Sequence, residues 1–314
     1  MSHFARGILS ALVGAALWGF SGSCSQYLFS HYDISPVLLT TIRMLGAGAL
    51  FMLVLHKNKR EVLHDVLSTP STVKRLLFYG SFGLFLNSFT YVLVISYTNA
   101  GTATVLQSLN VIFCLLASCV MERRGPRGLE IAGIICALVA TVLIATKGDL
   151  TALNLPLPGL IWGIINAICC ALYIMYPKRL FEQYGSLPIT GTGMLIGGIC
   201  ALAAWLGGGL VFGVTSGQLG ASVHVPAFGW DAIGLLVAIV CLGTFAAYGL
   251  YLHGVSIVGG VRGSLLGTLE PVSAMVFSAL WLSTVFVWAD WLALVLMVIT
   301  IVLVTLQGGD SSDS

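Results

Sequence analysis

The chain has 314 residues, of which 58% are hydrophobic and only 8% are charged. Because soluble domains carry about 25% charged residues, this composition excludes an ordinary soluble protein and indicates an integral membrane protein. The formal net charge is +2, and the sequence has no basic stripe interleaved with aromatic residues, so it gives no indication of nucleic-acid binding.

Ten apolar stretches follow one another along the chain, each long enough to cross a bilayer, for which about 20 residues are needed. They predict transmembrane helices at 7–29, 36–55, 76–96, 101–121, 128–146, 159–181, 188–212, 230–254, 260–282 and 287–306. A polar, glycine-rich connection is expected at 213–229. The predicted fold class is therefore an all-α integral membrane protein with ten transmembrane helices.

The ten predicted helices divide into two halves of five. We expect a first repeat over residues 1–147, a linker at 148–158, a second repeat over 159–307 and a polar tail at 308–314. Because five is an odd number, the second half enters the membrane from the opposite side. The two repeats are therefore expected to be inverted relative to each other.

Loop charges orient the helices, because loops on the cytoplasmic side carry an excess of Lys and Arg. With the N-terminus inside, all but two of the Lys and Arg residues fall in cytoplasmic segments or at a helix mouth. The exceptions are Lys147, in a predicted outer segment, and Arg43, within the second helix. We therefore expect a multi-pass protein of the cell membrane, plasma or inner, with both termini cytoplasmic.

The fourth and ninth predicted helices match when one is slid along the other. Asn110 then falls on Glu270, 160 positions further along the chain (270 − 110). Gln107 and Asn110 share one helical face in the first copy, and Gly267 and Glu270 share the same face in the second. Interrupted segments at corresponding places in two halves point to a transporter whose binding site lies at the repeat interface.

Glu270 lies near the middle of the ninth helix and is followed by Pro271. A charge at this depth costs at least about 2.5–3.5 kcal/mol on insertion scales, so it must face something other than lipid. Pro271 cannot donate a hydrogen bond to the carbonyl of Gly267, so the helix is weakened beside the charge. In a functional interpretation Glu270 binds a cationic group or exchanges a proton. In a structural interpretation it is neutral, or is hydrogen-bonded to the backbone that Pro271 frees.

Other polar groups within the helices are candidates for the same cavity. Arg43 would favour a substrate carboxylate if it faced the cavity, but it could instead snorkel outward or bind carbonyls of a neighbouring helix. We therefore group Arg43 with Glu270 as a coupling or structural charge. Gln107 and Asn87 are expected to bind substrate, the alternative being hydrogen bonds between helices.

Aromatic residues within the apolar stretches are candidates for substrate contact, with core packing or interfacial anchoring as the alternative. The residues that we expect to bind substrate are Trp18, Tyr91, Trp162, Tyr173 and Tyr248. Trp18 and Trp162 are favoured because each precedes a glycine early in its half of the chain, which suggests that they are equivalent by the repeat.

The motifs of several other kinds of chemistry are missing from the sequence. All eight cysteines lie in apolar stretches, without a CxxC pair or a Cys/His cluster at zinc spacing, so we expect neither a metal site nor a disulfide framework. No GxxxxGK[ST], HExxH or GxSxG motif occurs. We therefore expect neither an ATP-driven pump nor an enzyme, and no cofactor; an ion or solute gradient would supply the energy.

Four short motifs carry a resemblance to a known family. They are ALWGFSG at 16–22, TIRML at 41–45, TATVLQ at 102–107 and LEPV at 269–272. In this order and topology the chain resembles the EamA family of the drug/metabolite transporter superfamily, and is most similar to its carboxylate/amino acid/amine transporter group. One departure is Ser283-Thr284 after the ninth helix, where the family often has Gly-Glu.

The resemblance implies a fold of two inverted five-helix repeats. It also implies alternating access through a central cavity lined by the first, third, fourth, sixth, eighth and ninth helices. From the resemblance and the buried polar residues we expect a secondary active transporter, an exporter or exchanger of small metabolites such as amino acids or amines. Its partners would be a small-molecule solute, membrane lipid and a proton or other coupling ion, and it would be a monomer or a homodimer.

Two alternatives to this function stay open. The first is an importer of an amine or a choline-like solute, because buried aromatic residues with one carboxylate suit a quaternary amine. The more remote alternative is a membrane protein whose polar residues serve a purely structural or sensing role. Such a protein would need a soluble domain or a catalytic cluster, and the sequence has neither.

Overall fold

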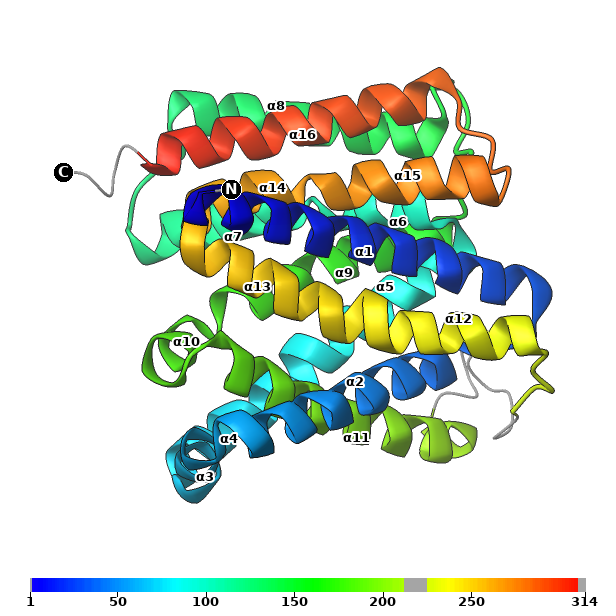
Figure 1. The fold of residues 1–314 in the computed structure, drawn as a ribbon. Coiled ribbons are helices and arrows are strands. Elements are labelled where there is room, and N and C mark those ends of the chain that lie inside the picture. Colours follow the sequence, from blue (N-terminus) through cyan, green and yellow to red (C-terminus); the bar gives the residue numbers. More distant parts are fainter. Residues whose placement is uncertain (1, 212–224, 310–314) are drawn as a thin grey trace.

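The computed structural model of the chain describes residues 2–211 and 225–309 (Figure 1). Most of the connection expected at 213–229 and most of the polar tail expected at 308–314 lie outside these ranges, as does the last residue of the seventh predicted helix. Every regular element within the described residues is helical.

Ten helical segments among the described residues are long and apolar enough to cross a membrane, as the sequence predicts. Five are single helices: α1 (His3–His31), α2 (Pro36–Asn58), α8 (Gly128–Thr146), α11 (Ser186–Val211) and α16 (Trp288–Gly309). The others are composite, and their parts are α4 (Pro70–Phe78), α5 (Leu86–Tyr97), α6 (Ala100–Gln107), α7 (Asn110–Met121), α9 (Leu157–Met175), α10 (Lys178–Tyr184), α12 (Trp230–Val240), α13 (Ala247–Val258), α14 (Gly260–Gly267) and α15 (Leu269–Trp281).

The fourth and ninth transmembrane helices are interrupted at matching places. The first part ends at Gln107 in one (α6) and at Gly267 in the other (α14), which are again 160 positions apart (267 − 107). In the ninth helix the break falls just before Pro271, which has no N–H for the hydrogen bond that would continue the preceding turn. In the fourth helix, Asn110 Nδ2 donates to the Gln107 carbonyl at 2.8 Å.

The third and eighth transmembrane helices share a second irregularity. A wider, π-helical segment joins α4 to α5 at Tyr79–Phe85, and another joins α12 to α13 at Cys241–Ala246. In the latter, Thr244 Oγ1 donates to the Ile239 carbonyl at 2.8 Å. Such segments are often found at functional sites. Their occurrence in the same helix of both halves supports the two-repeat architecture.

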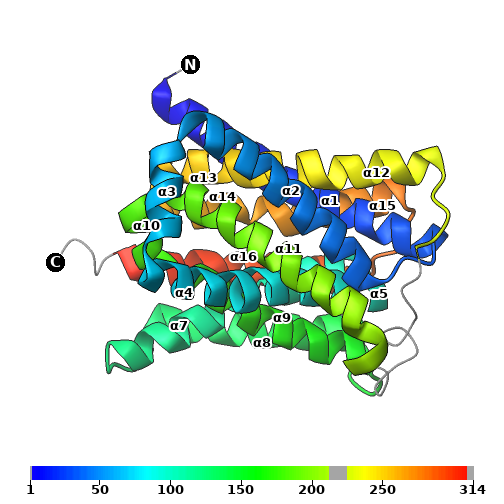
Figure 2. The ribbon, with the colours of Figure 1, turned by 90° about the horizontal axis from the view of Figure 1, so that it is seen from below.

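The helices form a bundle with two outer pairs (Figure 1). α8 packs on α16 at one edge, and α2 packs on α11 at the other; Figure 2 shows α2 and α11 running side by side. Both pairs join equivalent helices of the two repeats. Between them α1 packs on α13 at a separation that only small residues allow, because a Cβ at Gly14 would lie 2.7 Å from the Tyr251 nitrogen.

Two local features differ from the predicted elements. A short helix that the sequence did not predict, α3 (Arg60–Ser68), connects the second and third transmembrane helices, and only Val66 of α3 is buried. The sixth helix was expected to continue to residue 181, but α9 ends at Met175, and α10 begins after Pro177. Proline disrupts the interior of a helix because it lacks the N–H donor, which explains this division.

Candidate functional site

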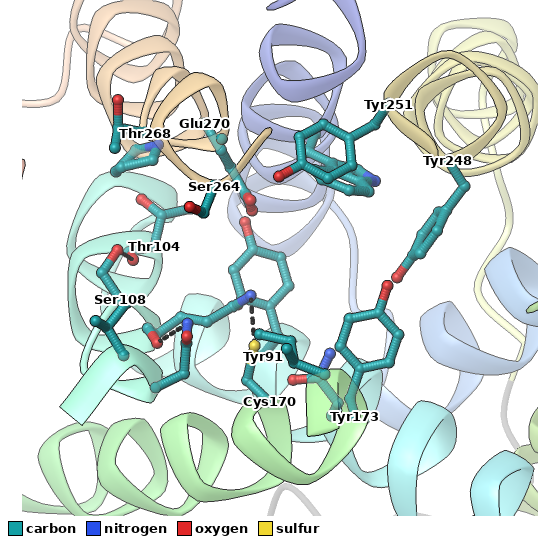
Figure 3. A pocket seen from close by; sticks show the side chains of 18 of the residues that line it. Tyr91, Thr104, Ser108, Cys170, Tyr173, Tyr248, Tyr251, Ser264, Thr268 and Glu270 are labelled. Carbon is teal, nitrogen blue, oxygen red and sulfur yellow. Dashed lines mark hydrogen bonds between the residues drawn. The ribbon is translucent and has the colours of Figure 1, made fainter. Parts of the chain in front are cut away.

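A cavity of about 360 Å³ lies between the two repeats (Figure 3). Its walls include residues of α1, α5, α6, α7, α9, α13, α14 and α15, which belong to the six transmembrane helices that the family resemblance implies. Arg43 of α2 and Ile301 of α16 also line it. The second and tenth transmembrane helices therefore contribute to the wall, which the resemblance did not imply.

All but one of the residues expected to bind substrate line this cavity, and so does Arg43. They are Trp18, Arg43, Asn87, Tyr91, Gln107, Tyr173, Tyr248 and Glu270. The fold therefore gathers side chains that are up to 252 positions apart in the sequence (270 − 18). A position at the cavity wall is necessary for contact with a substrate, and the contact itself stays a prediction.

Trp162 is the exception, and the expectation that it faces the cavity is corrected. It does not occur among the described residues that line the cavity; it is half-buried and packs against the apolar core. Trp18 packs edge-on against Tyr248, with ring centroids 4.9 Å apart. The corresponding contact in the other repeat is made by Asn166, whose Nδ2 donates to the Asn87 carbonyl at 2.9 Å.

The two contacts correspond because their partners are equivalent. Tyr248 and Asn87 each follow the π-helical segment of their transmembrane helix and lie 161 positions apart (248 − 87). Trp18 and Asn166 lie 148 positions apart (166 − 18). Trp162 is four residues before Asn166, about one turn of helix. The equivalence of the two Trp-Gly pairs is therefore wrong by one turn of helix.

Two opposite charges face the cavity from different repeats. Arg43 is 7% exposed, its Nη1 has no hydrogen-bond partner among the described residues, and its guanidinium carbon lies 6.0 Å from the centre of the Tyr91 ring. Glu270 projects from the first turn of α15 toward the Tyr91 hydroxyl (Figure 3). No salt bridge joins Glu270 and Arg43 in the described part of the chain, so each charge is available to a third group.

Aromatic side chains form the wall beside Glu270. The Trp18 ring lies 4.7 Å from the Tyr251 ring, centroid to centroid. The Tyr173 and Tyr248 rings are nearly perpendicular at 6.4 Å, and their hydroxyls point toward each other (Figure 3). Tyr251 is fixed by a 3.0 Å hydrogen bond from its hydroxyl to the Gly263 carbonyl. This wall presents ring faces and hydroxyls, a surface that suits a cationic group.

Amide side chains of the first repeat form another part of the wall. Gln107 Nε2 donates to Cys170 Sγ at 3.6 Å, and Gln107 Oε1 is buried without a hydrogen-bond partner among the described residues. Asn110, its neighbour across the helix break, also lines the cavity. The first repeat therefore gives the cavity its amides and the second repeat gives it the Glu270 carboxylate, while both repeats contribute aromatic rings.

Sequence reasoning did not select several small polar residues that line the cavity. They include Ser88, Thr104, Ser108, Cys170, Ser264 and Thr268. In an apolar helix such residues usually bond their own backbone, and Thr104 and Ser108 do so, each donating its hydroxyl to the carbonyl four residues earlier. The sequence did contain a signal for Thr104: it lies about one turn before Gln107, and therefore on the same face of the helix.

The cavity opens toward the end of the bundle where α1 begins, which we call the N-terminal end. Among its lining residues Ile174 and Ser264 are exposed, and both lie in helix segments at this end. Toward the opposite end the cavity is closed by Tyr91, which is 5% exposed. A Cβ at Gly22 of α1 would lie 2.7 Å from the Tyr91 hydroxyl, so the ring packs directly on α1.

Comparison with known proteins gives the family. The model of the EamA-like transporter family matches residues 5–146 and 157–306, one copy in each half of the chain. The uncharacterized inner membrane transporter YicL of Salmonella typhimurium is 33% identical over 309 residues, covering 98% of this chain and 97% of YicL. An uncharacterized transporter of Archaeoglobus fulgidus is 24% identical over 182 residues, covering 58% of this chain and 61% of that protein.

A solved crystal structure shares the fold. It aligns with a TM-score of 0.63 over 96% of this chain and 97% of its own, at 17% sequence identity. The two family matches agree with two repeats, and the ten apolar helical segments of the described residues agree with a multi-pass membrane protein. The chain belongs to the EamA-like transporter family, within the drug/metabolite transporter superfamily, and is a membrane transporter.

Proposed function

We propose that this transporter is a secondary active carrier of small metabolites such as amino acids or amines, which it exports or exchanges by alternating access. The observation that carries the proposal is that Glu270 and Arg43 face one cavity of about 360 Å³ without pairing with each other in the described structure. Small-molecule sites enclose about 300–1,000 Å³ and place a few polar groups in largely apolar walls. An amino acid would direct its ammonium to Glu270 and its carboxylate to Arg43.

The energy would come from a gradient, because the sequence lacks the phosphate-binding motif of ATP-driven pumps. We propose a proton as the coupling ion and Glu270 as the group that takes it up, since Glu270 is a carboxylate at the cavity wall. Buried carboxylates within transmembrane segments commonly mark proton or ion pathways.

We place both termini in the cytoplasm, because Lys and Arg then concentrate on the inner side, and the cavity would open toward the cytoplasm. The inner membrane location of the YicL relative supports a cell-membrane location. We divide the chain into repeats at 1–147 and 159–307, a linker at 148–158 and a tail at 308–314, a division that the two family matches support.

One alternative function has a specific observation in its favour. Trp18, Tyr248 and Tyr251 cluster beside Glu270, with the Trp18 ring 4.9 Å and 4.7 Å from the two tyrosine rings. Aromatic faces with one carboxylate recognise quaternary ammonium groups. A choline-like amine, imported rather than exported, would use this wall and would not need Arg43.

The test is a thermal-shift screen of the purified protein against amino acids, amines and carboxylates at two pH values. A ligand that binds the folded form alone raises its apparent stability. We expect stabilisation by a zwitterion that is weakened in both Glu270→Gln and Arg43→Gln. Stabilisation by quaternary amines that survives in Arg43→Gln would favour the alternative. A ligand whose effect is unchanged in both variants would place the substrate elsewhere and overturn the proposal.

A further inference from the structure

Gln26 of α1 joins three separate parts of the chain at the closed end of the cavity. Its Oε1 accepts hydrogen bonds from the backbone N–H of Ala100 at 2.9 Å and from the Ser278 hydroxyl at 3.0 Å. Its Nε2 donates to Thr284 Oγ1 at 2.8 Å. Ala100 is the first residue of α6, Ser278 belongs to α15, and Thr284 lies between α15 and α16. One side chain therefore ties α1 to both interrupted transmembrane helices.

Two of the three partners of Gln26 are buried. Ala100 and Ser278 are both fully buried. The N–H of Ala100 belongs to the first turn of α6, where backbone donors have no partner within their own helix. Gln26 supplies that partner from another helix. A second bond, 3.2 Å between the hydroxyls of Ser23 and Ser278, adds to the same contact between α1 and α15.

The Gln26 contacts lie beyond Tyr91, on the side away from the opening. Gly22 packs against both Tyr91 and Ala100, since a Cβ at Gly22 would lie 2.7 Å from the Tyr91 hydroxyl and 3.2 Å from the Ala100 Cβ. A solute in the cavity would therefore meet Tyr91 first and the Gln26 hydrogen bonds next. For the cavity to open at this end, α1 must separate from α6 and α15, and those hydrogen bonds must break.

The inverted repeat identifies the residues of the other half that are equivalent to Gln26 and Ser278. The offset of 148 positions that relates Trp18 to Asn166 also relates Gln26 to Ile174 (174 − 26). The offset of 160 relates Ser278 to Ser118 (278 − 118). Ile174 lines the cavity and is 47% exposed, so the position equivalent to the closed contact lies at the open end. Isoleucine cannot form the hydrogen bonds that Gln26 forms.

We infer that Gln26 is a latch: its side chain holds the cavity shut at the end opposite the N-terminus and biases the protein toward the conformation open at the N-terminal end. The inference rests on the alternating access proposed above, but not on the identity of the substrate. The bias toward this conformation follows because the two ends of the cavity form different hydrogen bonds when they close. Closing one end forms the Gln26 hydrogen bonds, whereas closing the other end brings Ile174 to the equivalent place and forms no such bonds.

The test measures which side of the membrane reaches the cavity. Of the eight cysteines, all within the described residues, only Cys170 lines the cavity. The full chain, with its other cysteines replaced by alanine, is placed in sealed vesicles of known orientation. The alkylation rate of Cys170 by a membrane-impermeant thiol reagent is measured from each side. The readout is the ratio of the rate from the opposite side to the rate from the side that carries the N-terminus.

Two variants should raise this ratio by different routes. Gln26→Leu removes the latch, and we expect a rise of about fivefold for each net hydrogen bond lost. Ile174→Gln introduces a glutamine at the equivalent position of the other end, where Ser118 and the first N–H of α14 are the equivalent partners. Its hydrogen bonds would hold the N-terminal end closed, so this variant should also raise the ratio. Gln183→Leu, the same replacement at an exposed position of α10, is the matched control and should leave the ratio unchanged.

The outcomes separate the latch from the transport proposal. A ratio for Gln26→Leu within twofold of the control overturns the latch, whatever the substrate is. If Gln26→Leu does not fold, the result for Ile174→Gln decides in its place by the same threshold. Because labelling of Cys170 needs no substrate, a wrong substrate class leaves the expected ratios unchanged. Protein that is never labelled from the opposite side in any variant, Ile174→Gln included, overturns both the latch and alternating access.

Discussion

Glu270 and Arg43 approach the same cavity from different repeats, and each lies near Tyr91 rather than being paired with the other in the described structure. Ionised groups away from water are costly unless they are paired. Two opposite charges held apart across a cavity can instead bind the two ends of one zwitterion.

Glu270→Gln should weaken binding of a cationic or zwitterionic substrate by about 10- to 100-fold, because hydrogen bonds to charged groups contribute about 1.5–3 kcal/mol. It should also abolish the pH dependence of transport if Glu270 carries the coupled proton. Equilibrium binding and vesicle transport at two pH values measure the two effects. Glu182→Gln, at an exposed position of α10, serves as the control. Unchanged binding and pH dependence in folded Glu270→Gln would make the carboxylate structural.

Arg43→Gln should separate zwitterions from simple amines. Affinity for an amino acid should fall by about 10- to 100-fold, since its carboxylate loses a charged partner, while affinity for the matching amine without a carboxylate should change little. Competition binding with such a pair measures the difference. Arg179→Gln, at an exposed position of α10, controls for the loss of one positive charge. An equal loss for both ligands would assign Arg43 to the packing of α2.

The two tryptophans should behave differently, because Trp18 lines the cavity and Trp162 does not occur among the described residues that line it. Trp18→Phe removes an indole N–H that is buried without a partner among the described residues, so we expect substrate affinity to fall about fivefold. Trp162→Phe should change the affinity less than twofold. Thermal-shift titration compares them, and an equal effect of the two variants would contradict the corrected repeat register.

Gly19→Val should destabilise the protein by about 1–3 kcal/mol through overpacking. A Cβ at Gly19 would lie 2.6 Å from both the Ala274 nitrogen and the Glu270 carbonyl oxygen, which are backbone atoms of α15 that cannot move aside singly. Gly234→Ala is the matched control, since its Cβ would meet no atom within 4 Å. Within a helix this change should be neutral or stabilising by up to about 1 kcal/mol. Melting temperatures of the purified variants measure both, and a Gly19→Val protein as stable as Gly234→Ala would show that α1 and α15 separate easily.

Several features of the site were predictable from the sequence because they depend on local pattern. The pairing of Asn110 with Glu270 at an offset of 160 located the interrupted helices, and the structure places both breaks there. Arg43 and Gln107 drew attention because a polar group within an apolar stretch needs a partner or a cavity. Trp162 did not follow the same rule, because tryptophan also packs well in an apolar core. In addition, its motif match was one turn out of register.

The sequence by itself determined the membrane class, the ten spans and the two repeats. Each of these follows from the length, order and composition of apolar stretches, since a bilayer sets a fixed thickness for any helix that crosses it. Only the tertiary structure decided which face of each helix meets the cavity, because a helix that is apolar all round carries no signal for its own rotation. It also decided the partners of Gln26, whose contact with Ser278 joins residues 252 positions apart and arises only when α1 packs on α15.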